Sequence, residues 1–399
     1  MWLRFRTATV MALLTAAFSH SLPAQRLSGG SVVLTSAAGI VSVRGDEAGK
    51  GNEVGRESLP LVSLPPLPDV EGFAGGFLGV SGDHLLFAGG ANFPGRKPWE
   101  GGTKVWSAEV FALPLSAVRA AAEGAGAGEG AGADNRGWQR VGRLPAPLGY
   151  GVSATFRDEL ILVGGSSAEG HASLVTAVGL ISGRLEQRSL PALPLPLANH
   201  TGTLVGSTVY VFGGQETPAS LAESAGWKLN LAEANARWSP LPQFPGPGRI
   251  LAAAAAVGDQ LWIVGGAELR RDADQSLVRT YLNDAWKLDP LDGWSRLPVI
   301  LRPSVAAPSP LPVWRQRLLL PGGDDGSQVG GNPVTHRGFP PMTQQFLTAE
   351  NRWLSGPDFP PAVVTSPTVT TPFGTVIASG EIRPGIRSPG VWLLREESR

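Results

Sequence analysis

The 399-residue chain contains no cysteine, only five scattered histidines, and equal numbers of basic and acidic side chains, 33 of each. The absence of cysteine excludes disulfide bonds, thiolate metal sites and cysteine nucleophiles. A net charge of zero leaves no electrostatic footprint for nucleic acid or for an acidic membrane surface. We therefore expect a partner that is neither a nucleic acid nor a membrane.

The chain also lacks a hydrophobic run of membrane-spanning length. Residues 1–24 begin with Arg4 and Arg6, continue through the apolar run Ala8–Phe18 and end in small residues. This pattern predicts a secretory signal peptide, because the apolar run is about half of the roughly 20 residues that a span needs. We expect export to the periplasm or the medium, with no membrane span in the mature chain. Residues 25–56 are polar and glycine-rich and are predicted to form a linker.

Glycine and proline are abundant, at 53 and 35 residues, and the glycines mark a repeat. Six apolar segments, such as LLFAGG and LWIVGG, each end in a pair of small residues. The pairs end at Gly90, Gly165, Gly214, Gly266, Gly323 and Gly380. Repeats of this length are typical of β-propeller blades.

Each copy contains four strand-like segments. A first segment of small residues, such as LAAAAAV at 251–257, precedes the diglycine segment. A third carries an aromatic residue, and a fourth carries a tryptophan followed by prolines. Small residues suit the innermost strand of a blade, because strands crowd at the propeller axis.

The sixth copy lacks its fourth segment. The missing strand is found at the other end of the repeat region, where SLPLVSLPPLP at 58–68 resembles the proline-rich fourth segments. The sequence therefore predicts that residues 57–399 form one all-β, six-bladed kelch-type propeller. We expect its ring to be closed by an N-terminal strand that completes the last blade.

The motifs also resemble a known family. GFAGGFLGVSGDHLLFAGGANFPG, GYGVSATFRDELILVGG and SGEIRPGIRSPGVWLL resemble the cyclically permuted mutarotase family, kelch-repeat relatives of bacterial N-acetylneuraminate epimerase, a sialic acid mutarotase. The resemblance implies an isomerase that interconverts anomers of N-acetylneuraminate or a similar acidic sugar without a metal or other cofactor. It also implies that Glu381 and Arg387 are the functional pair, and Arg383 stands where the epimerase has a lysine.

The repeat predicts where these residues lie. The loop after each second strand and the segment that leads into each first strand lie on one face of a propeller, so we expect a polar mouth near the axis. Glu381 is the candidate acid/base, and Arg387 is a candidate for binding the sugar carboxylate or stabilising negative charge. The substrate-binding candidates are Arg383, Arg249, His200, Tyr150, Asn92, Gln215 and Asp324.

Each assignment has a structural alternative. Glu381 and Arg387 could form a salt bridge that only shapes its loop, and His200 and Arg249 could bond backbone carbonyls. Asp324 with Asp325 suggests a cation site, although such a pair in a glycine-rich loop more often forms a turn.

The alternative function is a non-catalytic propeller that binds glycan or protein through the same mouth. A copper oxidase of the galactose-oxidase type is excluded, because its cofactor needs a cysteine-modified tyrosine. The sequence carries no signal for the oligomeric state.

Overall fold

A computed structural model describes residues 58–124 and 137–396. The predicted signal peptide and linker, residues 1–24 and 25–56, lie outside the described residues. The described chain is almost entirely β-structure, with one α-helix, α1 (Leu115–Ala122), and one 3₁₀ helix, η1 (Pro98–Glu100). No helix in these two ranges is long and apolar enough to cross a membrane.

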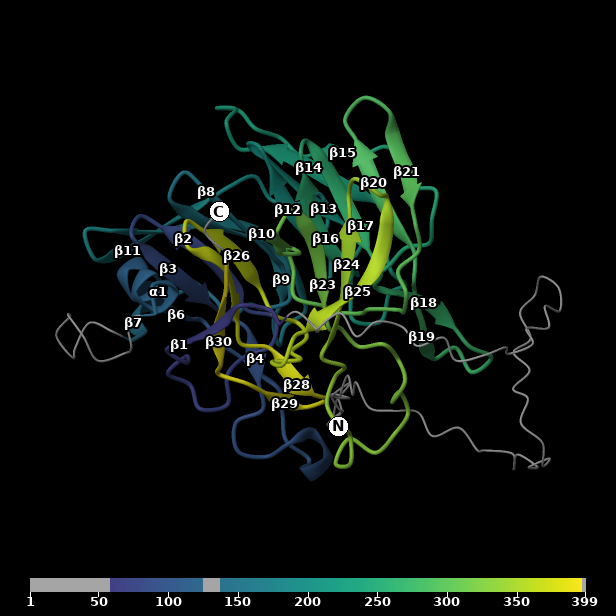
Figure 1. Cartoon of the computed structure of the whole chain (residues 1–399), viewed down its shortest axis with the longest axis horizontal. Coiled ribbons are helices and arrows are strands. Elements are labelled where there is room, and N and C mark those ends of the chain that lie inside the picture. The colour runs from purple at the N-terminus through teal and green to yellow at the C-terminus, as the bar shows by residue number, and fades with distance from the viewer. Residues whose placement is uncertain (1–57, 125–136, 397–399) are drawn as a thin grey trace, which may run out of the picture. The chain divides into compact units, whose positions relative to one another are not determined.

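Six antiparallel sheets of four strands each form a six-bladed β-propeller (Figure 1). The prediction of an all-β propeller with six blades is confirmed. The first blade consists of β2 (Phe77–Ser81), β3 (His84–Ala88), β6 (Glu109–Pro114) and β7 (Gln139–Arg143), and the second of β8 (Val152–Phe156), β9 (Glu159–Ser166), β10 (His171–Ile181) and β11 (Arg184–Ser189). The third consists of β12 (Thr201–Val205), β13 (Thr208–Phe212), β14 (Gly226–Asn230) and β15 (Ser239–Pro240), and the fourth of β16 (Ala253–Val257), β17 (Gln260–Val264), β20 (Ala285–Asp289) and β21 (Gly293–Leu297). The fifth consists of β22 (Val313–Trp314), β23 (Arg317–Pro321), β24 (Met342–Leu347) and β25 (Arg352–Asp358), and the sixth contains β26 (Thr368–Thr371), β27 (Gly374–Ala378) and β30 (Val391–Arg395).

The last of these sheets takes its fourth strand from the start of the described chain. Strand β1 (Leu61–Leu64) pairs antiparallel with β30, with Leu61 opposite Leu394 and Leu64 opposite Val391. The sheet order is β1-β30-β27-β26, so segments more than 300 residues apart share one blade.

A closed ring of six backbone hydrogen bonds links the blades at their innermost segments. In each blade one residue just before the first strand has a left-handed backbone, with φ between 53° and 65°. Its N–H donates to the carbonyl of the equivalent residue in the neighbouring blade, at 2.7–2.9 Å. These six ring residues are Gly75, Tyr150, Asn199, Leu251, Ala306 and Thr365.

The diglycine pairs form a second set of contacts between blades. Both members of each Gly-Gly pair have positive φ. In the first four blades the N–H of the second glycine donates to the carbonyl two residues before the next ring residue, and the N–H of Gly380 does the same in the sixth. In the sixth copy Ser379 replaces the first glycine, with φ of 59°. Its hydroxyl accepts a hydrogen bond from the N–H of Phe73 at 2.8 Å, which ties the last blade to the first.

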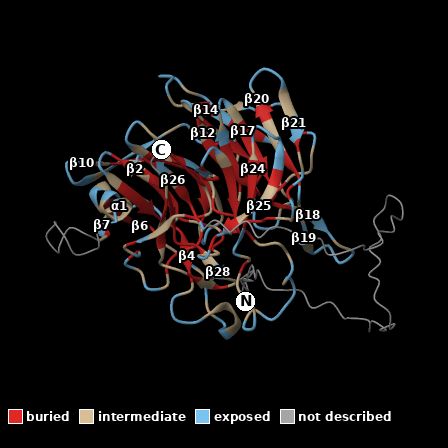
Figure 2. Ribbon diagram, in the orientation of Figure 1, coloured by how far each residue is buried: buried red, intermediate tan, exposed pale blue. Residues whose placement is uncertain are grey.

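The fourth-strand tryptophans explain the proline-rich segments. The indole N–H of each donates to a proline carbonyl in the preceding blade's exit, at 2.7–3.0 Å: Trp138 to Pro65, Trp238 to Pro191, Trp294 to Pro242 and Trp353 to Pro298. The apolar faces of the strands are buried between blades (Figure 2). Tryptophan and proline therefore form the same inter-blade contact in four of the six blades.

The first blade departs from the expected pattern between its third and fourth strands. The sequence predicts a low-complexity loop from 120 to 137, whereas helix α1 extends to Ala122. Val118 is fully buried and joins the apolar cluster shared by the first and last blades, which explains why the alanines before the glycine run are helical. Residues 125–136 lie outside the described residues.

Two glycines of the fourth blade test the diglycine contact. Gly265 and Gly258 have nearly the same φ, 61° and 62°. A Cβ on Gly265 would lie 2.4 Å from the carbonyl oxygen of Ser304, whereas a Cβ on Gly258 would meet open space. Gly258→Ala should cost about 1 kcal/mol of backbone strain. Gly265→Ala should cost about 1–3 kcal/mol more, measured by urea denaturation, because the next blade must shift. Equal losses for the two variants would contradict this account.

Candidate active site

One face of the propeller carries the segments that follow the second strands. In three blades these segments form two-stranded hairpins: β4 (Ala91–Asn92) with β5 (Val105–Trp106), β18 (Ala267–Arg271) with β19 (Leu277–Tyr281), and β28 (Glu381–Arg383) with β29 (Ile386–Arg387). In the second blade, β9 and β10 continue past the diglycine pair instead. All of these segments begin beside the ring residues.

The residue after each diglycine pair bridges to the residue just before a ring residue. These six positions are Ala91, Ser166, Gln215, Ala267, Asp324 and Glu381. Together with the six ring residues they surround the axis, and we call these twelve residues the mouth. The structure therefore brings together the loops and the incoming segments that the sequence assigns to one face.

Glu381 and Arg387 face each other across the hairpin of the sixth blade. Nη1 of Arg387 donates to Oε1 of Glu381 at 2.8 Å, and the N–H of Gly385 donates to the same oxygen at 2.6 Å. The side chain of Glu381 is 17% exposed, and that of Arg387 is 4% exposed. Oε2 of Glu381 accepts no hydrogen bond from the described residues, so one carboxylate oxygen is fixed and the other is available.

The first and second blades enclose the guanidinium of Arg387. Nε donates to the carbonyl of Ala91 at 3.4 Å, and the ring of Phe93 lies 4.9 Å from the guanidinium carbon. Burial alone would lower the pKa of Arg387, but the adjacent Glu381 and Tyr150 outweigh burial and raise it. Arg387 is therefore a permanent, almost fully buried cation with one carboxylate partner.

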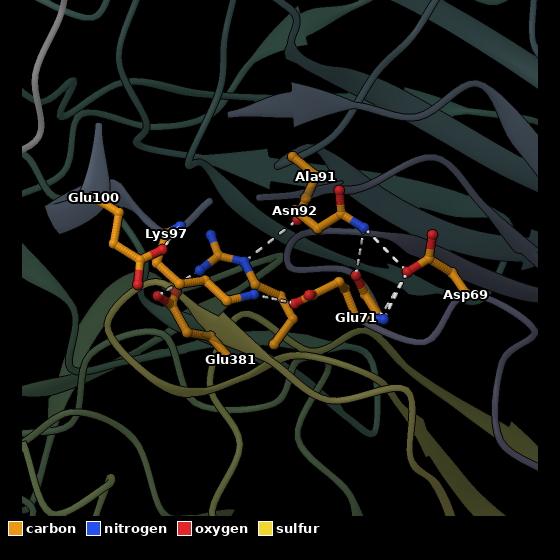
Figure 3. Close-up of polar contacts among 9 residues, drawn as sticks. Asp69, Glu71, Ala91, Asn92, Lys97, Glu100 and Glu381 are labelled. Carbon is orange, nitrogen blue, oxygen red and sulfur yellow. Dashed lines mark hydrogen bonds and ion pairs between the residues drawn. The ribbon is translucent and has the colours of Figure 1, made fainter. Parts of the chain in front are cut away.

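Asn92 holds a turn rather than facing the mouth. Its amide nitrogen donates to Asp69 at 3.2 Å and to the carbonyl of Gly72 at 3.0 Å (Figure 3). Asp69 also accepts the backbone N–H groups of Glu71 and Gly72. Asn92 thus fixes the segment before the first blade against β4, the strand that supplies the Ala91 carbonyl to Arg387.

Arg249 lies between blades with a fully buried side chain. It makes a bidentate pair with Asp284, at 2.7 and 3.0 Å, and a third bond to the Gly265 carbonyl at 3.1 Å. Trp286 donates to the same carboxylate at 2.7 Å. Although burial opposes ionisation of Asp284, these donors lower its pKa. Arg249 therefore does bond a backbone carbonyl, which is the structural alternative considered for it. Its main partner, Asp284, was not predicted from the sequence.

His200 lines a narrow axial cavity together with Tyr150, Thr201 and other residues of the innermost segments. Burial lowers its pKa to about 4 despite the nearby Val163 carbonyl, so the ring is neutral at neutral pH. Neither ring nitrogen has a hydrogen-bond partner among the described residues. Glu381 and Arg387 do not line this cavity, so the structure does not bring His200 together with that pair.

The remaining candidates are engaged with the protein. The side-chain amide of Gln215 donates to the Ser220 carbonyl at 2.8 Å, and Arg383 donates to the Val334 carbonyl at 3.4 Å. Asp324 accepts a hydrogen bond from the Tyr281 hydroxyl at 2.5 Å and another from the N–H of Gly326 at 3.0 Å. The second bond closes a turn. Within 58–124 and 137–396, no group of three histidine or acidic residues is arranged to hold a metal.

Tyr150 is the candidate that joins the pair most directly. It is a ring residue with φ of 60°, it lies beside Arg387, and its aromatic ring covers Gly75. A Cβ on Gly75 would lie 2.7 Å from Cδ1 of Tyr150, so glycine is required there. Lys104 and Trp106 extend this cluster. The sequence did not identify them, because they lie in the segment after the second strand, whose sequence is not repeated between blades.

Comparisons with known proteins cover part of the chain. Residues 48–182 match the sequence model of the N-acetylneuraminate epimerase family. The family resemblance predicted from the sequence is confirmed over this segment. N-acetylneuraminate epimerases of Salmonella enteritidis and Yersinia enterocolitica are 38% identical to the chain over 135 and 127 residues, which is 31% and 29% of this chain. The matches span only 30% and 27% of those relatives' own lengths.

A solved structure, that of YjhT, shares the fold. It has a TM-score of 0.58 and 14% sequence identity, and the match covers 81% of this chain and 94% of that one. The matched segment 48–182 includes Ala91, Phe93 and Tyr150, which surround Arg387. Glu381 and Arg387 themselves lie outside it.

The Arg249–Asp284 pair generates a stability prediction. Arg249→Met should reduce the free energy of unfolding by about 3–5 kcal/mol at pH 7, because it leaves a buried carboxylate unpaired. The lowered pKa of Asp284 means that the pair stabilises the fold above the unfolded pKa of about 3.9 and that this contribution is lost as pH falls further. The difference between wild type and variant, measured by urea denaturation, should therefore shrink below pH 4. Arg270→Met, which removes an exposed pair with Glu268, is the control and should change little. A loss that matches the control, or that is the same at pH 3 and pH 7, would be inconsistent with this role.

Proposed function

We propose that the protein is an exported isomerase that interconverts the anomers of N-acetylneuraminate or a similar acidic sugar by acid/base ring opening. The supporting observation is the Glu381–Arg387 pair at the mouth, with one carboxylate oxygen fixed and the other available. The family match over 48–182 supports the same class of substrate. The signal-like residues 1–24 support export.

Glu381 suits the acid/base role because mutarotation needs little else. A base takes the proton of the anomeric hydroxyl, the bond from the anomeric carbon to the ring oxygen breaks, and the ring oxygen gains a proton. The open keto form rotates and recloses on its other face. In this proposal Oε2 of Glu381 takes the first proton, and the resulting carboxylic acid supplies the proton for the ring oxygen.

Arg387 acts as a positioning residue in this mechanism. Its Nη1 and the Gly385 N–H both hold Oε1, so Oε2 is left without a hydrogen bond from the described residues. Its guanidinium is engaged with Glu381 and the Ala91 carbonyl and is covered by Phe93. The salt bridge that the sequence offers as a structural alternative is therefore also the means by which the acid/base group is oriented.

The test follows the anomer ratio by NMR after crystalline N-acetylneuraminate is dissolved in buffer with or without protein. Wild type should accelerate the approach to equilibrium in proportion to its concentration. Glu381→Gln keeps the shape of the side chain but removes the base, so it should lower the acceleration about 10²–10⁴-fold. Glu268→Gln, on the hairpin of the fourth blade, is the matched control and should retain wild-type activity.

Two outcomes would overturn the proposal. Wild type could fail to exceed the buffer rate, which would favour a non-catalytic binding propeller. Glu381→Gln could accelerate as well as Glu268→Gln does, which would place the chemistry elsewhere.

A further inference from the structure

The side chain of Lys104 holds its ammonium group at the mouth without a carboxylate partner. Its Nζ lies 3.9 Å from the centroid of the Tyr150 ring and 4.7 Å from that of Trp106. Trp106 is fixed in turn by a 3.2 Å hydrogen bond from its indole nitrogen to the hydroxyl of Ser166. Among the residues that the structure describes, no acidic side chain forms an ion pair with Lys104.

The neighbouring lysine shows the contrast. Lys97, in the same segment between β4 and β5, pairs with Glu71. Its charge is neutralised within the protein, whereas aromatic rings orient the charge of Lys104 and leave it uncompensated. A partly buried cation in this state attracts an anion from solution.

The position of Lys104 fits one part of the proposed substrate. Tyr150 contacts Lys104 and also lies beside Arg387, which holds Glu381. In a 2-keto sugar acid the carboxylate is bonded to the anomeric carbon itself, so the group that binds it must lie close to the acid/base. Arg387 is only 4% exposed and already paired, so it is poorly placed to bind that carboxylate.

We propose that Lys104 binds the carboxylate of the sugar acid and thereby selects acidic over neutral sugars. The inference rests on the proposed function for the identity of the sugar. It replaces Arg387 as the carboxylate-binding residue and leaves Glu381 as the acid/base. Tyr150 and Trp106 position the ammonium.

Binding measured by titration calorimetry tests this directly, with N-acetylneuraminate and its neutral methyl ester as probes. Lys104→Met keeps the length of the side chain and removes its charge, so it should weaken binding of the acid about 10–100-fold and leave binding of the ester unchanged. Lys104→Arg should retain most of the affinity for the acid. Lys97→Met, which removes a charge already paired, should bind the acid as wild type does.

Several outcomes overturn the inference: no detectable binding of the acid by wild type, an acid affinity of Lys104→Met within twofold of wild type, or an equal loss for acid and ester. Failure of the proposed function is distinguishable. If wild type binds the acid in a Lys104-dependent way but does not accelerate anomer exchange, the carboxylate site stands and the isomerase does not. If exchange is accelerated and Lys104→Met binds the acid as wild type does, the isomerase stands and the carboxylate site at Lys104 does not.

Discussion

The closed ring of backbone hydrogen bonds around the axis is the constraint on which the site depends. Each bond joins neighbouring blades, and the last joins Gly75 to Thr365, which are 290 positions apart in the sequence. Five of the six ring residues are not glycine, and each left-handed backbone costs about 1–2 kcal/mol. A hydrogen bond contributes about 0.5–1.5 kcal/mol, so bond and strain nearly offset. The gain is geometric, because each blade is fixed to both of its neighbours at the axis.

That placement sets the geometry of the mouth. The residue after each diglycine pair is bridged to the residue before a ring residue, so its side chain is set at the rim of the axis in every blade. In the sixth blade this position is Glu381, and the hairpin that follows returns Arg387 to it. The first and second blades then supply the Ala91 carbonyl, the Phe93 ring and Tyr150 around the guanidinium. The surroundings of the Glu381–Arg387 pair are therefore complete only when the sixth blade meets the first and second.

Much of this could be predicted from the sequence, because a propeller repeats its local rules. The diglycine positions, the small first strands and the tryptophan segments are spaced regularly, and the predicted six blades follow from them. The repeat predicted that the loop of Glu381 opens onto the mouth, whereas the Pro-Gly turn and the family resemblance suggested that Glu381 and Arg387 act together. The ring hydrogen bonds were not predictable, because residues as different as Tyr150, Leu251 and Thr365 occupy equivalent positions and only their backbones are alike.

Side-chain partners between blades escaped prediction for a related reason. Arg249 and His200 precede first strands as Tyr150 does, yet Arg249 is paired with Asp284 and His200 faces the axial cavity. His200 follows its ring residue by one position and Arg249 precedes its ring residue by two, so neither occupies the position in the repeat that Tyr150 has. Lys104 lies in the segment between β4 and β5, whose sequence is not repeated in the other blades, so no repeat could reveal it.

Exchange spectroscopy on N-acetylneuraminate at equilibrium tests the central claim most directly. The account predicts exchange cross-peaks between the two anomers that grow with protein concentration. It also predicts none for the methyl 2-glycoside, in which the anomeric hydroxyl is blocked and the ring cannot open. Absence of exchange above the protein-free rate for the free sugar would contradict the claim that the carboxylate at this mouth opens the ring.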